Sequence, residues 1–506
     1  MRTVSGPTDT VVVVGAGLAG LSAALRLVAA GRQVTVVERA AAPGGRAGRL
    51  ELSGYTFDTG PTVLTMPDLV ADALSCVGEE MHDWLDLEPL SPAYRAFFPD
   101  GSQLDVLTDV EAMAEHVRQV CGARDEAGYR RFVDFVRQLY DVEMRSFIDR
   151  NIDSPFELVG GDLARLVALG GLRRLAPKVA SYLKDPRLQR VFSFQAMYAG
   201  MSPYDALAIY AVISYMDTVA GVVHPRGGLQ AVPTAMASAA AKHGVTFCYD
   251  TEVSRVDTVA GRATGVITSN GRRIPADVVV LTADLPVAYR DLLPPKLAPR
   301  RLARLRYSPS AVVWHVGSRQ TYTATAHHNI HFGRAWRRTF TELVDERTLM
   351  SDPSLLVSRP TATEPGLAPP GCDSLYVLAP VPHLGNAGDP AIDWDVVGPR
   401  YREELLATLE ARGYVGLGEA IEVERLVTPA DWAAAGMAAG APFAAAHTVA
   451  QTGPFRPGNL VPGLANVVLA GSGTVPGVGV PMVLLSGRLA AERITGPVPY
   501  VSGARR

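Results

Sequence analysis

The sequence predicts an α/β fold with at least two domains, and three observations carry this prediction. The chain has 506 residues, more than a single hydrophobic core normally supports. Near the N-terminus, two valine-rich runs flank a glycine turn and an apolar helix, the pattern of a strand–helix–strand unit in a parallel sheet. Near the C-terminus, the uncharged stretch 467–487 also combines valines with repeated glycines. These two ends are therefore expected to contribute to one α/β domain.

The first element is the segment TVVVVGAGLAG, which starts at Thr10. Its β-branched run Val11–Val14 predicts a strand buried on both faces. Gly15, Gly17 and Gly20 then supply the GxGxxG spacing: the first permits a tight turn, the second lets backbone approach a pyrophosphate, and the third lets the helix pack on the strand. This spacing inside a strand–helix–strand unit predicts a dinucleotide site.

The second strand and the residues that follow it specify the dinucleotide further. Val34–Val37 are predicted to form this strand, and Glu38 at its end can accept hydrogen bonds from both hydroxyls of an adenosine ribose. The sequence continues with Gly44 and Gly45, which allow another close backbone approach, and with Arg46, whose planar fork suits phosphate oxygens. A unit that binds only NAD has no need of this extension.

These motifs resemble the superfamily of FAD-containing amine oxidases and carotenoid desaturases, especially bacterial-type phytoene desaturases of actinobacteria. GAGLAGL, the terminal Glu38, GGR (44–46) and FDTGP (57–61) carry the resemblance, together with PRGG (225–228) and the stretch 431–457. It implies a Rossmann-like FAD-binding domain of the GR2 type, assembled from the discontinuous segments 1–90, 221–290 and 421–506. It also implies a mixed α+β substrate domain, with a helical, membrane-facing part at 91–220 and a substrate-binding sheet region at 291–420.

The C-terminal stretch 467–487 is long enough to span a bilayer, but five glycines and two prolines argue against a helix exposed to lipid. We predict instead a strand, a glycine turn and a helix that starts near Pro481. This stretch is then the second half of the FAD site, with Arg488 and Arg493 of the helix in solvent. The motifs and the resemblance together predict the following FAD-binding residues: Gly15, Gly17, Leu18, Ala19, Gly20, Glu38, Arg39, Gly44, Gly45, Arg46, Gly60, Pro61, Thr62, Val253, Gly471, Gly473, Gly479, Val480, Pro481 and Met482.

The resemblance implies that the substrate is a long apolar polyene, phytoene or a related acyclic carotene, which is dehydrogenated in successive steps toward lycopene. A second complete GxGxxG is absent from the sequence, so oxygen or a quinone is expected to reoxidise the flavin. Asp217 in YMDTVAGVVHPRGG is the predicted catalytic acid/base. Its alternative role is that of a solvent-facing residue that caps a turn.

Charge and cysteine content place limits on partners and location. The net charge of −3 argues against nucleic-acid binding, and four cysteines without a CxxC pair fit a reducing compartment. The N-terminus lacks the apolar core of a secretory signal, so a cytoplasmic protein is expected. The basic, amphipathic segment 162–192 is either a solvated helix face or a patch that rests on anionic lipid, as is the basic segment 296–308. Peripheral membrane association without a transmembrane helix is the expectation.

Other functions and sites compete with this interpretation. His327, His328 and His331 lie close together, but strand alternation would send His327 and His328 to opposite faces and no acid stands at ligand spacing, so no metal is predicted. Rival activities on the same fold are those of an amine oxidase, which would favour an aromatic pair before the flavin, and of a carotenoid isomerase or ketolase. A non-catalytic prenyl-lipid-binding protein, like the Rab GDP-dissociation inhibitors, belongs to a different class.

Overall fold

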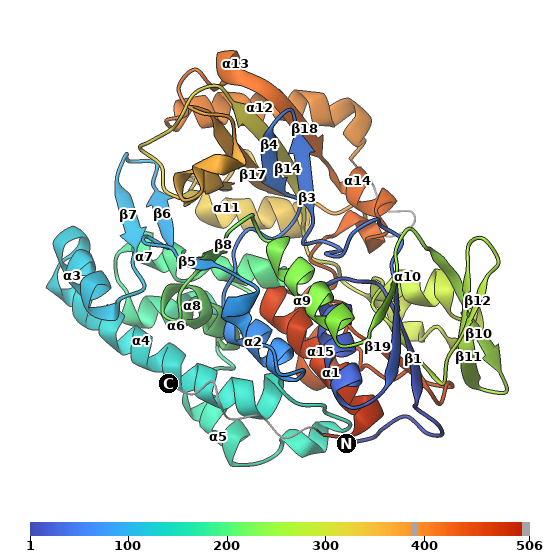
Figure 1. Cartoon of the computed structure of the whole chain (residues 1–506). Helices are drawn as coiled ribbons and strands as arrows, with labels where there is room; N and C mark the ends of the chain where they lie inside the picture. Colours follow the sequence, from blue (N-terminus) through green and yellow to red (C-terminus); the bar gives the residue numbers. More distant parts are fainter. Residues whose placement is uncertain (386–391, 498–506) are drawn as a thin grey trace.

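The computed structural model describes residues 1–385 and 392–497, and a parallel sheet of five strands lies at its centre (Figure 1). The strand order is β19-β13-β1-β2-β9. The strands are β1 (Thr10–Val14), β2 (Gln33–Val37), β9 (Thr246–Cys248), β13 (Val278–Leu281) and β19 (Val467–Leu469). All four pairings are parallel, as expected for short valine-rich runs buried on both faces. Three distant parts of the chain thus build one sheet, which confirms the predicted discontinuous Rossmann-like domain.

Helices α1 (Leu18–Ala29) and α15 (Val480–Thr495) pack against each other beside this sheet (Figure 1). Their close approach depends on Gly487, because a Cβ there would lie 2.2 Å from the carbonyl oxygen of Ala19. Helices α2 (Asp68–Ser75) and α9 (Ala231–Lys242) complete this layer. Within the described ranges, no helix combines the length and apolar character needed to cross a membrane.

The predicted solvent exposure of Arg488 and Arg493 on α15 is wrong. The side chain of Arg493 is only 3% exposed, and its Nη1 lies 2.7 Å from Oδ1 of Asp153. Arg488 Nη1 lies 3.0 Å from Oδ2 of Asp149. Both acids belong to the segment that follows α4, so these ion pairs fasten the helical part of the chain to the dinucleotide-binding part.

Two small antiparallel units adjoin the central sheet. A three-stranded sheet contains β10 (Val253–Val259), β11 (Arg262–Thr268) and β12 (Arg273–Pro275), and lies at one side of the molecule (Figure 1). An antiparallel hairpin follows GGR and consists of β3 (Arg49–Leu52) and β4 (Tyr55–Asp58).

A seven-stranded mixed sheet forms the second large unit, with the order β18-β14-β17-β16-β15-β6-β7. Its strands are β6 (Tyr94–Phe97), β7 (Gln103–Val106), β14 (Ser310–Ser318), β15 (His328–His331), β16 (Leu355–Ser358), β17 (Asp373–Val381) and β18 (Ile421–Val427). The stretch 91–220, expected to be helical, therefore contains two strands, and β18 falls after the expected boundary at 421. Both differences arise because alternating apolar residues, such as Tyr94 and Ala96 in β6, complete this sheet. Helices α11 (Trp336–Phe340), α12 (Trp394–Ala411), α13 (Leu417–Ala420) and α14 (Pro429–Ala434) flank it.

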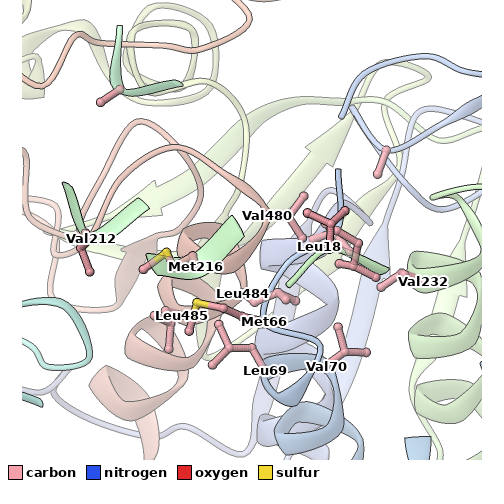
Figure 2. Packing of buried hydrophobic residues seen from close by; sticks show 14 of the residues in the cluster. Leu18, Met66, Leu69, Val70, Val212, Met216, Val232, Val480, Leu484 and Leu485 are labelled. Carbon is pink, nitrogen blue, oxygen red and sulfur yellow. The ribbon is translucent and has the colours of Figure 1, made fainter. Parts of the chain in front are cut away.

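The helical part begins with α3 (Val110–Cys121) and the long α4 (Ala123–Glu143), which continues as the π-turn Met144–Ile148. The basic segment expected to be one amphipathic unit is divided into α5 (Gly161–Ala168), α6 (Leu175–Tyr182) and α7 (Pro186–Val191), because glycines and Pro186 interrupt it. Helix α8 (Ala211–Thr218) returns toward the dinucleotide-binding part. Figure 2 shows Val212 and Met216 of α8 in one apolar cluster with Met66, which precedes α2, and with Leu485, which belongs to α15.

The PRGG and FDTGP motifs bind each other. Strand β8 (Val223–Pro225) pairs with β5 (Leu87–Pro89) and leads into the PRGG turn. There the backbone N–H of Leu229 donates to Oδ1 of Asp58 at 2.7 Å. Gly228, with φ of +82°, leaves room for this contact, since a Cβ would lie 2.8 Å from the same oxygen. Burial raises the pKa of Asp58 to about 7. The hydrogen bond from Leu229 lowers this pKa, but its effect is smaller than that of burial.

This raised pKa of Asp58 predicts how stability depends on pH. The folded chain retains the proton that the unfolded chain releases, so the Asp58 contribution to unfolding free energy should decrease as pH rises from about 4 to about 7 and then level off. The Asp58→Asn variant should have a smaller decrease, measured by urea unfolding across this window. An Asp134→Asn variant, altered at an exposed site, is the control. An Asn variant with the same pH dependence as the wild type would contradict this role of Asp58.

Candidate functional site

One cavity of about 1740 Å³ extends from the glycine loops of the central sheet to the helical part. It brings together residues from both ends of the chain, from β2 and from α8. Every predicted FAD-binding residue lines it except Gly20 and Gly473, and Asp217 lines it as well. The two exceptions have packing roles: a Cβ at Gly20 would lie 2.1 Å from the carbonyl oxygen of Gly15, and one at Gly473 would lie 2.5 Å from Cβ of Leu285.

The two N-terminal glycine loops touch through their backbones. Gly17 and Gly44 form an isolated parallel bridge, and a Cβ at Gly45 would lie 3.3 Å from Cα of Gly17. Gly15 and Gly44 adopt φ values of +106° and +137°, which L side chains rarely adopt. The loops therefore present backbone without side chains to the cavity, as a pyrophosphate requires.

Glu38 is held in a fixed orientation at the end of β2. Its Oε2 accepts a hydrogen bond from the N–H of Ala16 at 2.6 Å, and its Oε1 accepts one from the N–H of Ala40 at 2.9 Å. A carboxylate can accept roughly four hydrogen bonds, so each oxygen retains capacity for a ribose hydroxyl. Arg39 is directed elsewhere, since its Nη2 donates to the carbonyl oxygen of Ala435.

The C-terminal glycine loop forms the opposite wall. Gly471, Gly477 and Gly479 have φ values of +110°, +152° and +110°, and α15 begins directly after them. Pro481 occupies the first turn, where its missing N–H costs no hydrogen bond. The free N–H groups and partial positive charge of this helix end meet the cavity wall at Val480–Met482.

Two arginines connect this loop to its surroundings. Arg46 Nη1 donates to Oγ of Ser472 at 2.7 Å, which joins the two halves of the cavity. Arg456, only 2% exposed, donates to the carbonyl oxygens of Ser472 at 2.5 Å and Thr474 at 2.9 Å, and also contacts that of Gln451. Burial lowers the pKa of Arg456 to about 10. We did not predict Arg456 from the sequence, although its place in GPFRP lies within a motif that carries the resemblance.

These residues fit a dinucleotide cofactor, and specifically the FAD expected from the sequence. Two side-chain-free loops face the same space as an oriented carboxylate, and a helix N-terminus lies across from them. A Cβ at Gly17 or Gly45 would enter the narrow gap between the loops. The cavity extends well beyond this cradle, so it also has room for a second, apolar molecule.

Asp217 lies deep in the cavity wall and is not a solvent-facing cap. It is 2% exposed, and neither carboxyl oxygen has a hydrogen-bond partner within 3.5 Å among the described residues. Burial raises its pKa well above the usual range, while Gln195 and Tyr94 lie close enough to oppose this shift in part. The hydroxyls of Tyr94 and Tyr198 are likewise buried without partners in this part of the structure. Asp217 thus lies near two phenol hydroxyls that have no hydrogen-bond partner among the described residues.

The sequence did not indicate Tyr94, Gln195, Tyr198 or a second cavity-lining acid, Glu143. Tyr94 comes from β6, Gln195 and Tyr198 come from a 3₁₀ turn before α8, and Glu143 ends α4. Their positions depend on how three separate elements pack, and none belongs to a local motif.

The histidines of TAHHNIH are buried and bound to other side chains. His328 Nδ1 lies 2.9 Å from Oγ of Ser358, His327 Nδ1 lies 2.8 Å from Oγ1 of Thr363, and His331 Nε2 lies 3.3 Å from the hydroxyl of Tyr414. The expected separation of His327 and His328 is wrong, because β15 begins only at His328 and their ring centroids lie 4.5 Å apart. Across residues 1–385 and 392–497, no group of three His, Cys, Asp or Glu side chains is arranged to hold a metal ion.

Comparisons with known proteins support FAD as the cofactor. The model of a family described as flavin containing amine oxidoreductase matches residues 18–495. A phytoene dehydrogenase of Streptomyces griseus is 60% identical over 497 residues, which cover 98% of this chain and 97% of that protein. A zeta-carotene-forming phytoene desaturase of Myxococcus xanthus is 37% identical over 491 residues, which cover 96% and 93%. The solved structure of an oxidoreductase from Methanosarcina mazei has a TM-score of 0.59 at 18% identity, with 95% of this chain and 99% of that chain covered.

The buried guanidinium of Arg456 yields a prediction. The Arg456→Met variant should leave the carbonyl oxygens of Ser472 and Thr474 buried without donors, at a cost of about 1–3 kcal/mol for each group. Thermal unfolding should occur at lower temperature and FAD should bind at least about tenfold more weakly, measured by flavin fluorescence on titration. An exposed substitution, Arg400→Met, is the control. An Arg456 variant with wild-type stability and wild-type FAD affinity would contradict the role of this residue.

Proposed function

The chain belongs to the family of flavin-containing amine oxidoreductases, and on this premise we propose that it is an FAD-dependent desaturase of phytoene or a closely related acyclic carotene. The observation that carries the proposal is 60% identity, over nearly the whole chain, to a phytoene dehydrogenase. The shape of the cavity supports it, because the dinucleotide cradle opens into a long apolar space. Desaturation proceeds in successive steps toward lycopene.

FAD is held by Glu38 at the adenosine ribose, by the loops around Gly17 and Gly45 at the pyrophosphate, and by the N-terminus of α15. Arg46 keeps the two loop systems together through Ser472. When bound, FAD supplies a two-electron acceptor for hydride removed from carbon. The sequence contains one complete GxGxxG, so we assign reoxidation to a separate acceptor, oxygen or a quinone.

The polyene occupies the part of the cavity beyond the cradle. Its wall there is built from aliphatic and aromatic side chains of the helical part and of the segment 332–336, which follows β15: Leu158, Leu163, Leu166, Ile209, Val212, Ile213, Met216, Phe332 and Trp336. A hydrocarbon gains binding free energy by leaving water for such a surface, at about 25 cal/mol per Å². The wall also excludes water from the reacting carbons.

Asp217 acts as the proton acceptor. A new carbon–carbon double bond forms when one carbon loses hydride and its neighbour loses a proton, and Asp217 in its ionised form takes that proton. Val212 and Met216 of its helix α8 belong to the same apolar cluster as Leu485 of α15 (Figure 2), and Asp217 lines the same cavity as the flavin cradle. Tyr94 and Gln195 lie near enough to stabilise the carboxylate, whose charge burial disfavours.

The cavity reaches the surface beside an apolar patch, which we propose rests on a lipid bilayer. Phe156, Val159, Val167 and Leu172 are 84%, 72%, 52% and 51% exposed. Leu172 also lines the cavity, as do Pro155 and Leu158 beside Phe156. Arg165, Arg173 and Arg174, within two residues of Val167 or Leu172 in the sequence, are also exposed, and their charge complements anionic lipid headgroups. A substrate dissolved in the bilayer then enters without crossing water.

The role of Asp217 predicts the kinetics of its variants. With phytoene in liposomes and saturating FAD, Asp217→Asn should lower kcat by at least about 10²-fold, the lower range for a lost general base. In the wild type, kcat should rise with pH through a pKa well above that of an ordinary Asp, because only the ionised carboxyl accepts a proton. The Asn variant should lose this rise. Carotene spectra recorded over time supply the rates, and wild-type turnover in the variant would refute the assignment.

The membrane patch can be tested separately from turnover. A Phe156→Ser/Val159→Ser double variant should sediment with anionic vesicles at least about tenfold less than the wild type, because two exposed apolar side chains no longer enter the bilayer. Val396→Ser/Val415→Ser, altered at apolar residues that are also 70% exposed, is the matched control. Equal loss in both double variants, or no loss in the first, would exclude a specific membrane contact by this patch.

A further inference from the structure

Glu143 is a second buried acid of the cavity, distinct from the group around Asp217. It is the last residue of α4, is 5% exposed and lines the cavity beside Phe147 and Ile148. Neither of its carboxyl oxygens has a hydrogen bond or ion-pair partner among the described residues, and Oε1 is fully buried. Gln195 and Tyr94 lie near enough to Asp217 to lower its pKa, whereas burial alone shifts the pKa of Glu143.

Two polar side chains that line the cavity with Glu143 interact with residues other than Glu143. The Tyr210 hydroxyl lies 3.1 Å from the carbonyl oxygen of His447 and 2.6 Å from Oγ1 of Thr452. Burial raises the pKa of Tyr210. Arg150, another lining residue, lies 3.6 Å from Oε2 of Glu157. The protein thus supplies neither a donor nor a cation that satisfies Glu143.

An isolated carboxyl in such a place is neutral and has hydrogen bonds to offer. Burial alone raises the pKa of Glu143 well above its usual range, which favours its protonated form. A protonated carboxyl has one O–H donor and retains acceptor capacity. To leave a buried polar group unpaired lowers the stability of the fold, a cost that a leucine at this position would not have.

A pure hydrocarbon cannot form a hydrogen bond with Glu143, whereas a hydrocarbon that carries an oxygen atom can. We propose that Glu143 forms a binding site for the hydroxyl or carbonyl oxygen of an oxygenated polyene, which lies in the same cavity as the hydrocarbon substrate. The inference rests on the proposed function for the polyene itself and adds the class of its substituted members. The neutral carboxyl donates its O–H to either kind of oxygen and accepts from a hydroxyl.

The test compares two probes that differ by one hydroxyl group: lycopene and its 1-hydroxy derivative, each supplied in phosphatidylcholine vesicles to the FAD-loaded protein. Binding is measured by quenching of tryptophan fluorescence, since Trp336 and Trp432 line the cavity. The wild type should bind the hydroxylated probe at least about tenfold more tightly than lycopene, the ratio that a hydrogen bond to a buried group provides.

Three variants establish whether Glu143 causes this preference. Glu143→Leu should bind the two probes equally and unfold at a temperature at least as high as the wild type, because it removes an unpaired buried carboxyl. Glu143→Gln, which keeps a donor and an acceptor, should retain most of the preference. Asp141→Asn, at an exposed position of the same helix, should keep the wild-type ratio.

Equal affinity of the wild type for both probes would overturn the inference, as would an unchanged ratio in Glu143→Leu. The binding readout also separates this inference from the proposed function. A protein that prefers the hydroxylated probe through Glu143 but leaves phytoene unchanged would support the oxygen site and refute the desaturase assignment. A protein that desaturates phytoene but does not prefer the hydroxylated probe would support the desaturase assignment and refute the oxygen site.

Discussion

The packing of α15 on α1 is the contact on which the rest of the structure depends. Gly487 lets the two helices meet so closely that no side chain fits between it and the Ala19 carbonyl oxygen. Each helix follows a glycine loop, so this one contact places both loops on the same cavity. The ends of the chain, more than 450 residues apart in sequence, thereby form the two halves of one cofactor site. The buried arginine Arg456 then fixes the second loop through its carbonyl oxygens.

The cavity combines a large apolar surface with two acids whose burial carries a cost in free energy. Such groups lower the stability of the fold, and their presence is typical of functional sites, where perturbed pKa values accompany reactivity or recognition. Asp217 and Glu143 differ in their surroundings: an amide and a phenol lie near enough to Asp217 to affect its pKa, whereas burial alone shifts the pKa of Glu143. From this difference we assign proton transfer to Asp217 and oxygen recognition to Glu143 within one cavity.

The sequence predicts those parts of the fold that local backbone geometry determines. Glycines in a GxGxxG turn, a carboxylate at a strand end and a proline at a helix start act within a few residues, so the cradle for FAD could be identified. Arg493 shows the limit of such local inference. Its position near a helix end predicts a side chain exposed to solvent, yet the side chain is buried and forms an ion pair with Asp153 of a distant segment. Arg456, Glu143 and the strands β6 and β7 likewise acquire their roles from partners far away in the sequence.

The central claim is that electrons pass from phytoene to the flavin bound in this cavity, and anaerobic reduction tests it most directly. The FAD-loaded protein is mixed with phytoene liposomes in the absence of oxygen and quinone, and the visible flavin absorbance is followed. If phytoene reduces the flavin, this absorbance decreases while a carotene with more conjugated double bonds appears in proportion. Flavin absorbance that stays constant, although fluorescence quenching shows that phytoene occupies the cavity, would contradict it.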